Sequence, residues 1–130
     1  MPDAGPRRRV DPRRRLGVAG EDAVARWYAD AGYDVLDRNW RCRDGELDLV
    51  VIRGDTLVFC EVKTRASTRF GAPFEAVTAT KQRRLRNLAL RWLTEHGTHR
   101  RTLRFDVASV TRASNDELAI DVLEGAFQGE

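Results

Sequence analysis

Three residues of this sequence, Asp48, Glu61 and Lys63, have the types and the spacing to do chemistry together. They lie on two strand-like runs joined by Gly54-Asp55, a candidate for a two-residue hairpin turn, and this register places Asp48 directly opposite Glu61. Two carboxylates about 4 Å apart repel by roughly 4 kcal/mol at an effective dielectric near 20, so a counter-charge is required. A divalent cation would supply it, because Mg²⁺ favours carboxylate and water ligands. Lys63 could then orient an attacking water or stabilise charge on a phosphate.

The same residues also allow an arrangement without a metal ion. Glu46 and Lys63 face each other in this register and could form an ordinary cross-strand ion pair. If the Asp-Gly pair at residues 44–45 is also a two-residue turn, Arg41 lies opposite Asp48 and could neutralise it. The spacing therefore leaves a metal site and a set of ion pairs as open alternatives.

The hairpin register also predicts which of its side chains enter the core. One face is wholly apolar, whereas the other is apolar near the turn and charged at the open end, where Asp48 and Glu61 lie. The apolar face consists of Leu47, Leu49, Val51, Val58, Cys60 and Val62.

The hydrophobic pattern along the chain predicts one α/β domain with the element order α-β-β-β-α-β-β. Apolar residues recur at helical spacing over residues 16–31 and 79–96, and a glycine follows each run as a stop signal. The second helix carries a basic outer face. The predicted strands are Tyr33–Arg43, Glu46–Arg53, Leu57–Thr64, Arg101–Thr111 and Glu117–Leu123, with a loop over 65–73 and a short helical turn over 74–77.

Charge is distributed unevenly along the 130 residues, which suit a single domain placed at residues 16–125. Residues 1–15 contain six arginines and two aspartates, a net charge of +4, whereas the whole chain carries +3. This segment has three prolines and few apolar residues, so we expect a disordered basic tail. The tail either contacts phosphates or is simply solvated.

Composition excludes several classes of protein. No apolar run approaches the roughly 18 residues of a membrane span, and the arginine-rich start lacks the apolar stretch of a secretory signal. We therefore expect a cytoplasmic protein without membrane contact. The two cysteines are too few for a disulfide scaffold and lack the paired spacing of a zinc site.

The residues around the hairpin resemble those of the YraN family of small bacterial proteins. That family belongs to the restriction-endonuclease-like PD-(D/E)XK group and is similar to archaeal Holliday junction resolvases. The resemblance covers about residues 16–111 and implies a single restriction-endonuclease-like domain with a mixed central sheet flanked by helices. It is carried by Gly45–Val50 and Val58–Arg65, and further by Gly17–Val24, Gly32-Tyr33, Glu75–Val77, Lys81 and Arg104–Val107.

The resemblance also implies roles for individual residues. By match to the motif, Asp48 and Glu61 would be metal ligands, Lys63 the catalytic lysine, and Glu21 the helix-one acid that completes the site. Glu21 could instead be an exposed glutamate that favours the helix dipole. Leu47 stands where the group's name has a proline. Backbone contacts to nucleic acid are expected from Arg65, Arg69, Lys81 and Arg84 and from the basic tail.

Three functions from different classes are compatible with these observations. The first is Mg²⁺- or Mn²⁺-dependent hydrolysis of DNA phosphodiesters, including branched or processed DNA. The second is nucleic-acid binding with a weak or silent nuclease site, and the third is an adaptor whose basic tail docks an acidic partner. Junction resolution would need two active sites and would imply a homodimer. The choice between DNA and RNA stays open.

Overall fold

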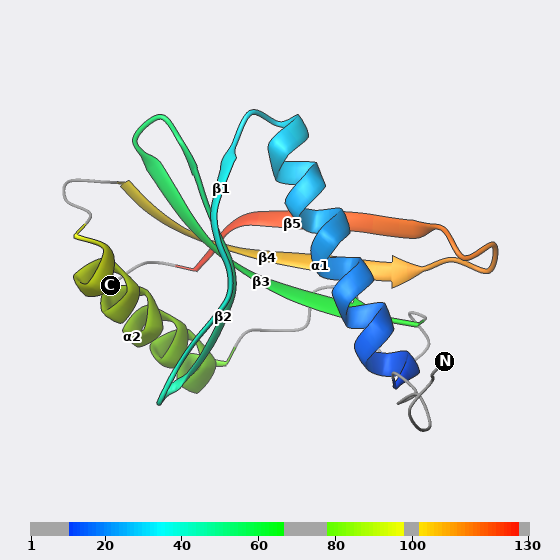
Figure 1. The fold of residues 1–130 in the computed structure, drawn as a ribbon, viewed down its shortest axis with the longest axis horizontal. Coiled ribbons are helices and arrows are strands. Elements are labelled where there is room, and N and C mark those ends of the chain that lie inside the picture. Colours follow the sequence, from blue (N-terminus) through cyan, green and yellow to red (C-terminus); the bar gives the residue numbers. More distant parts are fainter. Residues whose placement is uncertain (1–10, 67–77, 98–101, 128–130) are drawn as a thin grey trace, which may run out of the picture.

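Two helices and five strands follow one another in the predicted order (Figure 1). The computed structural model describes residues 11–66, 78–97 and 102–127. Helix α2 agrees with the prediction at both ends, and the strands agree within one residue except at the end of β5. The elements are α1 Pro12–Asp30, β1 Asp34–Cys42, β2 Gly45–Arg53, β3 Thr56–Arg65, α2 Ala79–His96, β4 Thr102–Arg112 and β5 Leu118–Phe127.

The two ends of the domain differ from the prediction. Asp11 caps α1 by accepting a hydrogen bond from the Arg13 N–H at 2.9 Å, and Pro12 occupies the first turn, where its missing N–H is not needed. The prediction of a disordered tail over 1–15 is therefore wrong for residues 12–15, and residues 1–10 lie outside the described residues. At the other end, β5 continues beyond the predicted boundary at residue 125 to Phe127.

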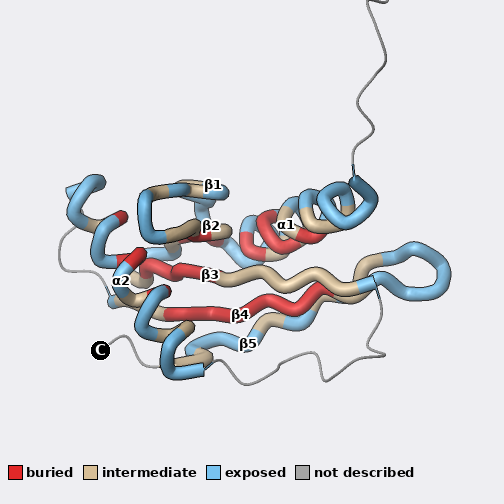
Figure 2. The backbone as a smooth tube through the Cα atoms, turned by 90° about the horizontal axis from the view of Figure 1, so that it is seen from below, coloured by how far each residue is buried: buried red, intermediate tan, exposed pale blue. Residues whose placement is uncertain are grey.

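The strands form one mixed sheet in the order β1-β2-β3-β4-β5. Strands β3 and β4 are parallel, with α2 in the connection between them, and the other neighbouring strands are antiparallel. Helix α1 covers one face and α2 the other, each over its own apolar cluster, and the central strands β3 and β4 hold much of the buried surface (Figure 2). The predicted mixed sheet flanked by helices is confirmed. Within the described residues, no helix combines the length and hydrophobicity needed to cross a membrane.

The turn between β1 and β2 is not the predicted Asp44-Gly45. Cys42 pairs with Gly45, so Arg43 and Asp44 form the turn. Gly45 has a φ of 146°, a conformation that side-chain-bearing residues rarely adopt, so the glycine is needed beside the turn rather than within it. As a consequence Arg41 lies opposite Glu46, and the alternative in which Arg41 lies opposite Asp48 is wrong.

A buried aspartate connects α1 to strands β4 and β5. Asp106 in β4 is 1% exposed and accepts hydrogen bonds from the Tyr28 hydroxyl at 2.6 Å and from the Gly125 N–H at 3.0 Å. The Arg104 guanidinium adds two more hydrogen bonds at 2.9 Å and neutralises the carboxylate. A buried charge is tolerated when it is paired and fully hydrogen-bonded, so this network holds the C-terminal half of α1 in place.

The N-terminal half of α1 approaches β3 very closely. Gly20 is buried, and a Cβ atom built on it would lie 2.1 Å from the Thr64 Oγ1 and 3.1 Å from the Thr64 Cβ. No side chain fits between the helix and the strand at this point. The absence of a side chain at Gly20 therefore sets the depth at which the following residue, Glu21, is held over the sheet.

Adding a single methyl group at this contact should move the helix. We expect Gly20→Ala to destabilise the protein by about 1–3 kcal/mol, as overpacking commonly does, measured by urea unfolding. Thr64→Ala removes the nearest side-chain atoms, so the double variant should recover part of the loss. A Gly20→Ala protein as stable as the wild type would show that α1 is free to shift on β3.

Candidate metal centre

Strands β2 and β3 separate at the position where the sequence places its acidic residues. The predicted register of the hairpin is confirmed from Arg53–Thr56 to Leu49–Cys60, and the pairing of these two described strands ends there. Beyond that point the Asp48 Oδ2 accepts a hydrogen bond from the Val62 N–H at 2.8 Å. A side chain thus takes the place of a backbone partner, and the predicted direct pairing of Asp48 with Glu61 is not formed.

The separation also changes which face the β2 side chains occupy. Leu49 and Val51 pack in the α1 cluster as predicted, but Leu47 packs in the α2 cluster. The prediction of one apolar face including Leu47 is therefore wrong, because the strict alternation of side chains is lost at Asp48. This loss of alternation places the Glu46 and Asp48 side chains on the α1 side of the sheet instead of the α2 side.

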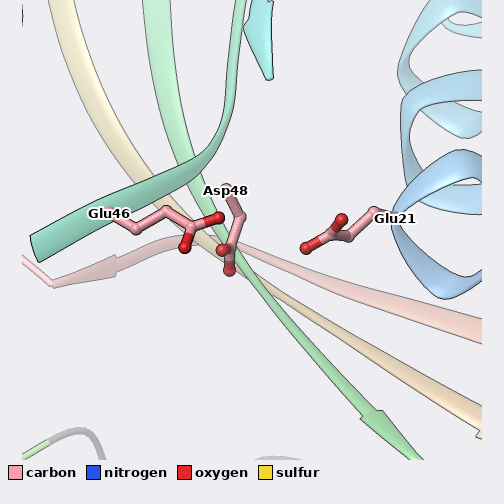
Figure 3. Close-up of side chains that lie close together, drawn as sticks. All are labelled: Glu21, Glu46 and Asp48. Atoms are coloured by element: carbon pink, nitrogen blue, oxygen red, sulfur yellow. The ribbon is translucent and has the colours of Figure 1, made fainter. Parts of the chain in front are cut away.

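Three carboxylates converge at this place. Glu21 points from α1 toward Glu46 and Asp48 on β2 (Figure 3), and the three side chains offer oxygens that all lie within 4.8 Å of one another. Each of the three is half-buried. Glu46 also has the Arg41 Nε at 3.4 Å from its Oε2. Oxygen atoms from a helix and a strand are therefore grouped closely enough to hold a divalent cation.

Asn39 connects the helix carboxylate to the strand carboxylate. With its amide nitrogen turned toward the acids, Asn39 donates to the Glu21 Oε1 at 3.1 Å and to the Glu46 Oε1 at 2.9 Å. Its backbone is left-handed, with a φ of 52° in the middle of β1, a conformation that asparagine tolerates better than most residues. The local distortion directs the amide into the cluster.

The cluster holds more negative charge than its neighbours neutralise. Burial, together with the charges of Glu21, Glu61 and Glu46, raises the pKa of Asp48 to about 6, although the hydrogen bond from Val62 opposes this shift. Burial is also the largest cause that raises the pKa of Glu21, and the Glu46 carboxylate adds to it. A bound cation would relieve both effects.

Glu61 faces the other helix. Its Oε1 lies 3.3 Å from the Lys81 Nζ, and the side chain is only 14% exposed. Its Oε2 is buried and has no hydrogen-bond partner among the described residues. The charge of Glu61 contributes to the raised pKa of Asp48, but Glu61 is not one of the three described carboxylates whose oxygens lie within 4.8 Å of one another.

The other residues predicted to act lie along β3 and the first turns of α2. Lys63 pairs with Ser109 and Arg65 with Thr111 in the parallel β3–β4 ladder, and both residues are half-buried. Strand alternation places Lys63 on the same face as Glu61. Arg84 is exposed on α2, one turn after Lys81, and Arg69 lies outside the described residues.

Two members of the site were not identified from the sequence. Glu46 is predicted only as an ion-pair partner, because the hairpin register places it directly opposite Lys63. Asn39 carried no motif, and its role depends on a backbone distortion within β1. The signal that could have found Glu46 is its spacing of two from Asp48, which keeps both side chains on one side of the strand.

The fold and the site define a small α/β protein with a carboxylate cluster where two strands diverge. Residues 20–110 match the family described as "Uncharacterised protein family UPF0102". The chain belongs to this family, which is the YraN family that its motifs resemble, so that prediction is confirmed. The assignment to the PD-(D/E)XK group stays a prediction.

Relatives in several bacteria are similar over most of their length. The UPF0102 protein of Frankia casuarinae is 54% identical over 112 residues, which cover 86% of this chain and 95% of that protein. The UPF0102 protein of Beutenbergia cavernae is 52% identical over 110 residues, 85% of this chain and 93% of that protein. Among solved structures, Pyrococcus furiosus SfsA in complex with Ca²⁺ aligns with a TM-score of 0.45 and 14% identity, over 92% of this chain and 73% of that one.

The raised pKa of Asp48 predicts a pH-dependent stability. Between about pH 4 and pH 6 the folded protein holds a proton at Asp48 that the unfolded chain releases, so the contribution of this group to stability falls as the pH rises. Asp48→Asn keeps an acceptor for the Val62 N–H but has no charge. With a chelator present, we expect Asp48→Asn to be more stable than the wild type at pH 7.5 by about 2 kcal/mol.

This advantage should shrink as the pH is lowered to about 4.5. Urea unfolding of both proteins across this range measures the difference directly, and titration of all other groups cancels to first order. A difference that does not change with pH would contradict a raised pKa at Asp48.

Proposed function

We propose that this protein is a metal-dependent nuclease that hydrolyses nucleic-acid phosphodiesters, with DNA as the favoured substrate. The observation that carries the proposal is the convergence of the Glu21, Glu46 and Asp48 carboxylates at the point where β2 leaves β3. The resemblance of Asp48, Glu61 and Lys63 to the PD-(D/E)XK pattern supports the same chemistry.

The donor atoms suit a hard divalent cation. All are carboxylate oxygens, which favour Mg²⁺ or Mn²⁺, and no histidine or cysteine belongs to the group, as zinc would favour. The buried Glu61 Oε2 lacks a partner among the described residues, so it has coordination capacity to offer. Asp48, with Glu21, Glu46 or Glu61, would hold the ion.

The chemistry requires both an activated water and charge stabilisation. A bound divalent cation polarises a phosphoryl oxygen and lowers the pKa of bound water. Lys63, two residues beyond Glu61 in β3, would place its ammonium on the attacked phosphate and stabilise the charge that builds up there. Water adds to phosphorus and gives up a proton, the P–O bond to the leaving sugar oxygen breaks, and that oxygen takes up a proton, so the net reaction consumes one water.

The proposed site separates metal binding from catalysis, and both can be measured. We expect the wild type to bind Mn²⁺ in calorimetry and to cut at least one of linear, flapped and four-way DNA. Asp48→Asn should lose both properties. Lys63→Ala should keep Mn²⁺ binding and DNA affinity but lose most cleavage, because a catalytic lysine acts on the transition state.

Lys63→Met serves as the control for folding, because it keeps most of the aliphatic stem. It should unfold at the same urea concentration as the wild type and be as inactive as Lys63→Ala. Cleavage by Lys63→Ala at the rate of the wild type would show that Lys63 is not catalytic. A wild type that binds DNA but cuts no substrate with Mg²⁺ or Mn²⁺ would favour a silent site.

The bridge made by Asn39 predicts a residue that acts on the metal through its ligands. Asn39→Gly removes the amide yet suits the left-handed backbone, so stability should change by less than about 1 kcal/mol. Loss of such a supporting hydrogen bond typically costs about 10- to 100-fold in metal affinity, and we expect a loss of that size for Mn²⁺ in calorimetry.

Asp116 provides a matched control for this variant. It is the other non-glycine residue with a positive φ among the described residues, at 67°, and it lies in the turn between β4 and β5. Asp116→Gly makes the same backbone change away from the carboxylates and should leave Mn²⁺ affinity unchanged. Equal Mn²⁺ affinities for Asn39→Gly and the wild type would mean that the amide does not position the ligands.

A further inference from the structure

A groove runs beside the carboxylate cluster, between the first turns of α1 and the β1–β2 hairpin. It encloses about 520 Å³, and its lining includes Glu21, Asn39 and Glu46 together with Arg14 and Arg41. Both arginines are exposed, Arg41 by 75% of its side chain, whereas Glu21 and Glu46 are half-buried. Positive charge therefore lines the mouth of the groove, and the carboxylates lie deeper.

This arrangement suits a polyanion that binds the arginines at the mouth of the groove while a metal cation binds the carboxylates below them. In the structure Arg41 lies against Glu46, with the Nε atom 3.4 Å from the Oε2 atom. A divalent cation held by Glu46 would take over the neutralisation of that carboxylate and leave the Arg41 guanidinium available to another anion. Guanidinium groups bind phosphate through paired N–H donors, which gives them both affinity and orientation.

The wall of the groove formed by α1 adds a second kind of contact. Val18 is a large apolar residue with 49% of its surface exposed, one turn of helix beyond Arg14 and beside Gly17. An exposed apolar side chain next to an arginine suits a sugar or base next to its phosphate. An acidic polypeptide would also offer carboxylates to the arginines, whereas a guanidinium beside an apolar side chain matches the phosphate and the sugar or base of one nucleotide.

Lys81 in α2, one of the residues expected to contact nucleic acid, is less available for such contacts. Lys81 is only 26% exposed, and its Nζ already lies 3.3 Å from the Glu61 Oε1. Arg14, in contrast, projects from the exposed side of the first turn of α1. The groove side of the cluster therefore offers Arg14 at an exposed position, and Arg41 once a cation relieves its pairing with Glu46.

We infer that the groove between α1 and the β1–β2 hairpin receives the phosphodiester backbone of the nucleic acid, and that Arg14 and Arg41 bind the phosphates on either side of the reacting one. This inference rests on the proposed function, since it takes the carboxylate cluster to be the reacting centre. Arg14 belongs to the basic segment 1–15 from which phosphate contacts are expected, whereas no sequence motif pointed to Arg41.

Binding can be tested separately from cleavage. Fluorescence anisotropy with a labelled DNA duplex, measured with Ca²⁺ as the divalent cation for the carboxylates over a series of salt concentrations, reports affinity and the number of phosphate contacts. We expect Arg14→Gln and Arg41→Gln each to weaken binding and to lower the salt slope by about 0.9, the value for one phosphate contact. Mn²⁺ affinity should be unchanged in Arg14→Gln. In Arg41→Gln it should be unchanged or tighter, because the substitution removes the positive guanidinium group beside Glu46.

Arg26 supplies the matched control. It is exposed on the same helix, about 18 Å further along its axis than Arg14 at 1.5 Å per residue, which exceeds the Debye length of about 8 Å at physiological salt. Arg26→Gln changes the net charge equally and should keep the affinity and salt slope of the wild type. Equal effects of Arg14→Gln and Arg26→Gln would overturn the inference, because general charge would then explain the binding.

The failures of the inference and of the proposed function give different results. Wild-type Mn²⁺ binding and DNA cleavage, with groove variants that bind DNA like Arg26→Gln, would overturn only the inference. A wild type that binds no DNA overturns it as well, and Mn²⁺ calorimetry then shows whether the metal site stands. Arginine-dependent binding of polyglutamate in place of DNA would identify an acidic polypeptide as the occupant and also overturn the inference.

Discussion

The hydrogen bond from the Val62 N–H to the Asp48 carboxylate is the interaction on which the site depends. It forms where β2 and β3 stop pairing, so it satisfies a backbone donor that the neighbouring strand no longer reaches. The same bond holds a carboxylate in a half-buried position among other acids, which is why the pKa of Asp48 rises to about 6 despite the hydrogen bond. If β2 and β3 continued to pair beyond Leu49 and Cys60, no gap between the strands would be left for the carboxylates.

The position of α1 has to be accurate for this gap to become a site. Close contact between Gly20 and Thr64 sets the height of the helix at its N-terminal half. At the other end, the buried network around Asp106 joins Tyr28 to β4 and β5. Glu21 lies between these two attachments, and its carboxylate is delivered to the cluster by rigid elements rather than by a loop. Such support is what a binding site for a small cation needs, because ligand positions must hold to a fraction of an ångström.

The charges of the region form a pattern with two levels. Two basic side chains of the protein are paired at the edges of the carboxylate cluster, Arg41 with Glu46 and Lys81 with Glu61. Asp48 has no arginine or lysine in an ion pair among the described contacts. The protein's own basic side chains therefore neutralise Glu46 and Glu61 but not Asp48. Burial and the charges of neighbouring acids raise the pKa of Asp48, which is the effect expected where a carboxylate lacks a nearby cation. The pattern favours an external cation at the centre and an anionic ligand at the borders.

Local sequence determined the elements of this protein, because helix periodicity, strand composition and the Gly54-Asp55 turn are properties of short segments. The register of the β2–β3 hairpin followed from the same signals down to Leu49 and Cys60. The start of α1 at Pro12 was also encoded locally, in an Asp-Pro pair that caps a helix, although the arginines around it suggested disorder. Asp48 and Glu21 could be named from a motif, but their proximity could not be derived from spacing.

Only the tertiary structure decided where the strands part, which face Leu47 and Glu46 occupy, and that Asn39 joins a helix to a strand. These features depend on the twist of a whole sheet and on the depth at which α1 docks. Both are set by packing between segments far apart in the chain, so no short window of sequence contains them.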